Sequence, residues 1–75
     1  MVSNLTFDYS KLRGRIVEKY STLSAFAQAI GISDGTLSSK MNSKTYFSNE
    51  EIVEACKLLG IRFEEVQSYF FTLKV

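Results

Sequence analysis

Histidine and proline are absent from this chain, and cysteine occurs once. Without histidine there is no Ser–His–Asp or Cys–His pair and no side chain that ordinarily titrates near neutrality to act as a general base. One cysteine forms no internal disulfide, and the chain lacks the four nitrogen or sulfur ligands of a structural zinc site. We therefore expect no catalytic residues, no metal, no cofactor and no enzymatic activity.

Long apolar runs are also missing. None approaches the ~20 residues that span a membrane, and residues 1–9 lack the basic start and apolar stretch of a secretory signal. Helical spacing places Cys56 in the core as an inert thiol, and a lone thiol without an export signal favours a reducing compartment. We expect a cytoplasmic protein with no membrane contact and no small-molecule substrate.

What remains is the composition of one small globular domain covering residues 1–75. Hydrophobic residues make up 45% of the 75 positions, too many for a disordered tail. The charges are unevenly distributed: residues 1–47 carry six Lys or Arg against three Asp or Glu, net +3, whereas residues 48–75 carry three against five, net −2. This asymmetry either orients the basic part towards an anion or is ordinary surface decoration.

Apolar periodicity predicts an all-α fold of five helices and a short extended C-terminal segment. The expected helices cover residues 9–20, 23–30, 34–41, 49–59 and 63–70. Their inward positions are Leu12, Ile16, Val17, Tyr20, Leu23, Phe26, Ala27, Ile30, Leu37, Met41, Ile52, Val53, Cys56, Leu59, Phe63, Val66 and Phe70. Capping residues mark the helix ends: Asp8, Ser21 or Thr22, Ser33, and Ser48 with Glu51 as N-terminal caps, and Gly31 and Gly60 as C-terminal ones.

Residues 22–42 have the spacing of a helix-turn-helix. Ala27 is small enough to let a second helix cross closely, and Gly31 supplies the positive φ of a tight corner. Ile32 and Leu37 anchor the corner and the second helix to a common core. In this motif the second helix enters the DNA major groove.

The pattern resembles the lambda-type phage repressor and Cro superfamily of helix-turn-helix proteins. It is more closely similar to short phage-encoded proteins of Gram-positive hosts, many known only as domains of unknown function. The resemblance covers about residues 7–75. The sequence segments on which the resemblance rests are Asp8-Tyr9-Ser10-Lys11-Leu12-Arg13-Gly14-Arg15-Ile16, Phe26-Ala27, Gly31-Ile32-Ser33, Thr36-Leu37-Ser38, Lys40-Met41-Asn42-Ser43-Lys44, Glu51-Ile52, Leu59-Gly60-Ile61 and Tyr69-Phe70-Phe71.

The resemblance implies a transcriptional regulator that binds operator sites in double-stranded DNA. Carried over from the superfamily, the base-reading positions are Ser33, Asp34, Gly35, Thr36, Ser38 and Ser39, and the phosphate contacts are Thr22, Ser24, Gln28, Lys40, Asn42, Lys44 and Tyr46. Purely structural roles compete with these. Ser33 is equally an N-cap, and Asp34 is favoured as an acid that stabilises the first helical turn. Lys40 and Lys44 are either phosphate contacts or solvated surface lysines. The base-reading positions lack the Arg and Gln that read bases most strongly.

We expect a homodimer, because residues 70–75 alternate like a strand with no obvious partner in the chain. The candidate dimer contacts are Phe70, Phe71, Leu73 and Val75. The alternative function is a protein-binding modulator on the same fold, an antirepressor or co-repressor with another regulator as its partner. The weak reading helix and the acidic C-terminal half favour that alternative, since fold does not fix function.

Overall fold

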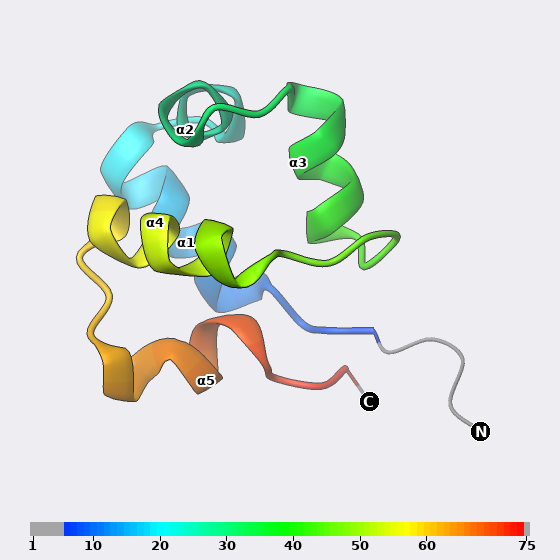
Figure 1. Ribbon diagram of the computed structural model, residues 1–75, viewed down its shortest axis with the longest axis vertical. Helices are drawn as coiled ribbons and strands as arrows, with labels where there is room; N and C mark the ends of the chain where they lie inside the picture. Colours follow the sequence, from blue (N-terminus) through cyan, green and yellow to red (C-terminus); the bar gives the residue numbers. More distant parts are fainter. Residues whose placement is uncertain (1–5, 75) are drawn as a thin grey trace.

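The computed structural model describes residues 6–74 and confirms an all-α fold with five helices among them (Figure 1). Helix α2 lies at the top of the view and is seen nearly end-on, α3 runs down the right side, α4 runs across the middle, and α5 lies at the opposite end from α2. In chain order the elements are α1 (Ser10–Tyr20), α2 (Leu23–Ile30), α3 (Asp34–Met41), α4 (Asn49–Leu59), the 3-10 turn η1 (Phe63–Glu65) and α5 (Val66–Phe70).

The core forms around α1, which contacts α2, α4 and α5. The largest side chains that are completely enclosed come from all five helices; they are Leu12, Ile16, Phe26, Leu37, Leu59 and Phe70. Each such side chain contributes about 1.5–3 kcal/mol through removal of apolar surface from water. Because every helix supplies at least one of them, the helices stabilise one another rather than folding alone.

Local capping explains why the helices begin where they do. The hydroxyl oxygen of Ser33 accepts the Thr36 N–H at 3.1 Å at the start of α3. At the start of α4, Ser48 and Glu51 form the reciprocal capping box, with bonds of 2.8 and 3.1 Å. Gly31 ends α2 with φ of +87°, in the left-handed region that glycine adopts without strain. The bounds of α2, α3 and α4 are therefore those predicted.

The start of α1 differs from the prediction. Tyr9, not Asp8, occupies the N-cap position, and no side chain caps the helix. The Asp8 carboxylate instead accepts the backbone N–H and the hydroxyl of Ser10 at 2.9 and 2.6 Å. These two bonds lower the pKa of Asp8.

Three positions predicted to face inward are exposed. Val17 and Val53 are about half exposed and Phe63 is 90% exposed. Each lies on an apolar helical stripe, but the domain is too small to cover the whole width of every stripe. Phe63 also lies in η1, because the helix expected over residues 63–70 is a 3-10 turn followed by the short α5.

The C-terminal segment has a partner within the same chain, which corrects the basis of the predicted dimer contact. The Asp8 N–H donates to the Thr72 carbonyl at 2.7 Å, and the Lys74 N–H donates to the Thr6 carbonyl at 2.9 Å. An antiparallel bridge joins Phe7 to Leu73 between them. The alternation of the tail therefore reflects pairing with residues 6–8.

Candidate functional site

The first candidate surface is formed by α2 and α3, which contact each other across the turn at Gly31. Ala27 and Leu37 are buried beneath it as predicted. The surface holds all six predicted base-reading residues. Ser33, Asp34, Gly35, Thr36 and Ser38 are exposed, and Ser39 is half-buried.

Hydrogen bonds within this surface occupy several of those groups. The Asp34 carboxylate accepts the Ser24 hydroxyl at 3.0–3.1 Å, which ties the start of α3 to α2. The Ser33 hydroxyl donates to Thr36 Oγ1 at 2.8 Å in addition to capping the helix. The structural roles weighed for Ser33 and Asp34 are thus both present.

Lys40 is buried, which removes the main cation of α3 from the surface. Its ammonium group lies 3.0 Å from the Glu51 carboxylate and donates to the Tyr46 carbonyl at 3.1 Å. A side chain held in this way cannot reach a phosphate without breaking an ion pair, so we leave Lys40 out of any nucleic-acid interface. The exposed positions of α3 then carry no positive charge, and Asp34 makes them net negative.

The other predicted phosphate contacts are spread around α2 and the loop after α3. Ser24, Gln28 and Lys44 are exposed, and the Lys44 ammonium has no partner among residues 6–74. The remaining exposed side chains make local contacts: Thr22 caps α2 through Ala25 N–H, Asn42 donates to the Ser38 carbonyl, and Tyr46 packs edge-on against Phe7. One cation is a small charge for duplex binding, which depends on neutralising several phosphates.

The second candidate surface is apolar, and two of its residues were predicted as contacts of other kinds, Tyr46 with phosphate and Phe71 with a second copy. Exposed Tyr46, Val53, Phe63 and Phe71 lie on it, together with half-buried Ile52 and Val66; we call these six residues the apolar face.

Three hollows of this surface run into one another. Ile52 borders both an aromatic pocket and a groove between α4 and η1. Phe63 and Val66 border that groove and a third hollow that ends at Phe71, which also borders the pocket. The apolar face is therefore continuous, and contiguous exposed apolar surface is typical of binding sites.

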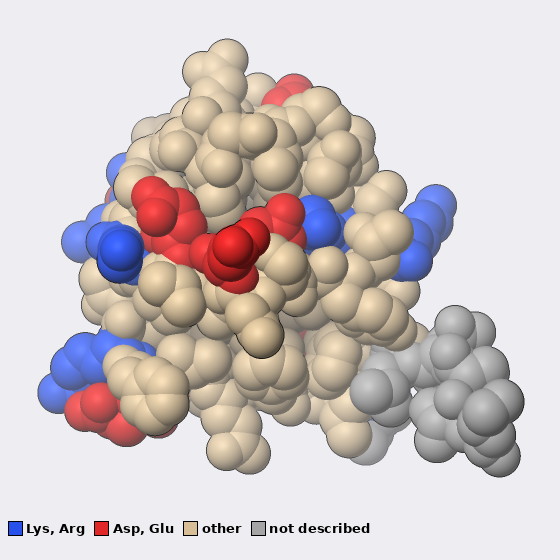
Figure 2. All heavy atoms as spheres, viewed as in Figure 1, with Lys and Arg blue, Asp and Glu red and all other residues tan. Residues whose placement is uncertain are grey.

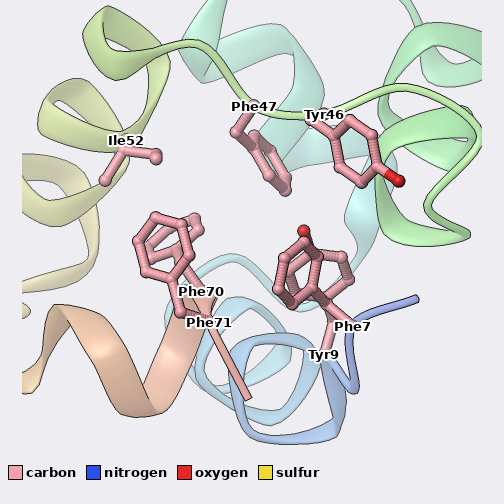
Figure 3. A pocket seen from close by; sticks show the side chains of 7 residues that line it. All are labelled: Phe7, Tyr9, Tyr46, Phe47, Ile52, Phe70 and Phe71. Atoms are coloured by element: carbon pink, nitrogen blue, oxygen red, sulfur yellow. The ribbon is translucent and has the colours of Figure 1, made fainter. Parts of the chain in front are cut away.

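The aromatic pocket is the best-formed of these hollows, with a volume of about 220 Å³. Three aromatic pairs from distant segments converge on it, with Ile52 as the remaining wall (Figure 3); the pairs are Phe7 with Tyr9, Tyr46 with Phe47, and Phe70 with Phe71. Edge-to-face contacts hold the walls, with ring centroids 5.4 Å apart for Phe47 and Phe70 and 6.0 Å apart for Phe7 and Phe71. Such pairs prefer this geometry and stiffen the pocket.

Acidic side chains border the apolar face along α4. Figure 2 shows them gathered across the middle of the molecule, where α4 lies. Glu51 is held by Ser48 and Lys40. Burial tends to raise its pKa, but the Ser48 N–H and the Lys40 ammonium together lower the pKa below its ordinary value. Glu50 and Glu54 are exposed and form no ion pair with any described residue.

The predicted dimer residues lie partly on this surface. Phe70 is 2% exposed and cannot contact a second copy, because it fills the core beneath the pocket. Phe71 and Leu73 are exposed, and Val75 lies outside the described residues. Cys56 is half-buried, and burial raises the pKa of its thiol.

Two cations of α1 also have partners inside the domain. Lys11 donates to the Ser68 hydroxyl at 3.0 Å and lies over the ring of Tyr69. Arg15 donates to the carbonyls of Leu59 and Gly60 at 2.8 and 3.1 Å and so caps the C-terminal end of α4. Part of the positive charge of residues 1–47 therefore stabilises the fold through contacts inside the domain.

A family model described as "Protein of unknown function (DUF739)" matches residues 5–73. The chain belongs to this family. Among solved structures it is similar to "the modulator of repression (MOR) of the temperate bacteriophage TP901-1 from Lactococcus lactis", determined in solution. The two chains are 39% identical, the match covers 88% of this chain and 89% of the other, and the TM-score is 0.79. No curated protein sequence matches the chain. Within residues 6–74 no helix has the length and apolarity to cross a membrane.

Proposed function

We propose that this DUF739 chain is a phage-encoded modulator of transcriptional repression that acts in the bacterial cytoplasm by binding another regulator protein, without catalysis. The observation that carries the proposal is its 39% identity, over almost the whole of both chains, to a modulator of repression from a temperate phage. That neighbour supports a regulatory role, and the surface of this chain supports binding to a protein.

Two features of the surface favour a protein partner over an operator. The exposed part of α3 carries Asp34 and no cation, because Lys40 is paired with Glu51. The apolar face exposes large side chains, including Phe63 and Phe71, that a polyanion would not cover. Aromatic residues are enriched at the centre of protein–protein interfaces.

The test is complex formation between the purified chain and the repressor encoded in the same genome. Sedimentation velocity should show a complex of fixed stoichiometry. The substitution Phe63→Ser should weaken it, whereas Val17→Ser, which removes a half-exposed apolar side chain from α1, should not. Two components that sediment independently at all ratios would contradict the proposal.

Operator binding is the second candidate, and the α2–α3 surface is the observation that favours it. There the two helices form a single helix-turn-helix unit whose second helix is capped and exposed at Ser33 and Thr36. Ser, Thr and Gly at reading positions imply water-mediated contacts or recognition of DNA shape. Selection from random duplexes by a homodimer of the chain would enrich a pseudo-palindrome, whereas a protein-binding modulator would enrich nothing.

A further inference from the structure

We propose that the aromatic pocket is an anchor site that takes one tyrosine or tryptophan side chain from a basic segment of a partner protein. This inference rests on the proposed protein-binding function and adds the chemistry of the segment that binds. It follows from the size of the pocket, its single polar group, the surface around it and the charge beside it.

The volume of the pocket suits one side chain. Cavities that enclose small-molecule ligands usually measure about 300–1,000 Å³, whereas this one measures about 220 Å³. Its walls are rings, including Phe47 and Phe71, which favour another flat apolar group by edge and face contacts. Tyrosine and tryptophan are also the side chains that most often dominate binding energy at protein interfaces.

One polar atom faces this cavity, the hydroxyl of Tyr9. Figure 3 shows it pointing between the rings of Phe47 and Tyr46. Tyr9 is 6% exposed, but its hydroxyl opens into the cavity, because no enclosed side-chain oxygen or nitrogen of the described residues lacks a hydrogen-bond partner. A guest ring with an O–H or N–H at its edge bonds to this hydroxyl in place of water, and a phenylalanine ring does not.

The surroundings of the pocket identify the guest as part of a polypeptide. The apolar face continues from Ile52 into the groove that Phe63 and Val66 border, so a bound chain extends well beyond the anchor ring. Glu50 precedes Val53 of the apolar face by three residues, about one helical turn, and Glu54 follows Val53 directly; neither carboxylate forms an ion pair with any described residue. Lys or Arg about one helical turn from the anchor would complement them.

The first experiment uses side-chain analogues as probes. 4-Methylphenol, 3-methylindole and toluene are each titrated into the isotope-labelled chain, and NMR shifts are recorded. The phenol and the indole should cause saturable shifts at Ile52, Phe47 and Phe71 and bind several-fold more tightly than toluene. Tyr9→Phe should abolish that difference, while the matched change Tyr69→Phe, at a buried tyrosine outside the pocket, should leave it intact. Absence of saturable shifts, or a preference for the phenol and the indole over toluene that persists in Tyr9→Phe, overturns the proposal.

The second experiment tests the charge beside the pocket with a displayed library of random peptides. The wild-type chain should enrich sequences that have Tyr or Trp near Lys or Arg. Glu50→Lys combined with Glu54→Lys should lose the basic preference and keep the aromatic one, whereas Glu18→Lys with Asp34→Lys, at exposed acids on α1 and α3, should change neither. Enrichment without an aromatic residue, or one unaffected by the Glu50 and Glu54 changes, contradicts the proposal.

Failure of the anchor site is distinguishable from failure of the proposed function. A repressor complex that forms equally well with Tyr9→Phe and with the Glu50 and Glu54 variant removes the anchor site and leaves the modulator function. If the phenol probe binds saturably but the chain forms no complex with the repressor, the anchor site is supported and the repressor is excluded as its partner.

Discussion

The ammonium nitrogen of Lys40 lies 3.0 Å from Oε1 of Glu51, and this contact joins the last turn of α3 to the first turn of α4. The same nitrogen donates to the Tyr46 carbonyl and lies 5.9 Å from the centre of the Phe47 ring. One buried cation therefore positions the loop that carries two walls of the aromatic pocket. This structural role differs from the phosphate contact predicted for Lys40 from the sequence.

Replacing Lys40 should lower stability more than replacing its exposed neighbour. Lys40→Met leaves the Glu51 carboxylate without its ion-pair partner and should cost about 1–2 kcal/mol of unfolding free energy. Lys44→Met, at an exposed position, should stay within about 0.5 kcal/mol of the parent chain. Urea unfolding monitored by circular dichroism measures both, and equal values for the two variants would show that the ion pair contributes nothing.

Acid should destabilise the protein partly through Glu51. The folded-state pKa of Glu51 lies below its ordinary value of 4.5, so its contribution is present above pH 4.5 and is lost as the pH falls through the folded-state pKa. Glu51→Gln should be less stable at neutral pH and should lose less stability in acid. Glu50→Gln, at an exposed residue of the same turn, should keep the slope of the parent chain. Parallel profiles for Glu51→Gln and the parent would contradict this assignment.

Two glycines should respond to alanine in opposite directions. Gly14 lies within α1, and an added Cβ would meet nothing within 4 Å, so Gly14→Ala should stabilise the chain by about 0.5–1 kcal/mol. Gly31 has φ of +87°, so Gly31→Ala should destabilise it by about 1 kcal/mol. Thermal unfolding of both variants gives the comparison, and a stabilised Gly31→Ala would show that the corner tolerates another backbone conformation.

Substitution of an exposed phenylalanine and of a buried one should differ in their effect on stability. Phe63→Ala should change the unfolding free energy by less than about 0.5 kcal/mol, because the ring is 90% exposed. Phe70→Ala should cost about 3–5 kcal/mol, because it empties a buried site. A large loss of stability in Phe63→Ala, measured by urea unfolding, would mean that this ring packs against the domain and is not available to a partner.

The helices could be predicted from the sequence wherever a side chain or a glycine marks the end. Ser33, Ser48 and Gly31 act within a few residues of the chain, so their effect on α2, α3 and α4 is local. The burial of Val17, Val53 and Phe63 was predicted wrongly, because periodicity identifies an apolar stripe without saying how much of its width other elements cover.

The surface features depended on contacts between distant segments, which no local pattern contains. Lys40 finds Glu51 across a turn, and the tail pairs with residues 6–8 at the other end of the chain. A signal for the pocket was nevertheless present: aromatic residues occur in pairs at 7 and 9, 46 and 47, and 70 and 71. The core encloses only some of these rings, and the exposed members of the pairs, Tyr46 and Phe71, lie on the apolar face.

The most direct test of the account is the affinity of the repressor from the same genome for its operator, measured with and without this chain. Operator DNA is titrated with repressor at physiological salt, and the chain is added at increasing concentration. We predict that the apparent affinity changes and saturates at a fixed ratio of chain to repressor, and that Phe63→Ser reduces the effect. Repressor titrations that do not change at any concentration of the chain, together with operator binding by the chain alone, would contradict the account and favour direct DNA recognition by α3.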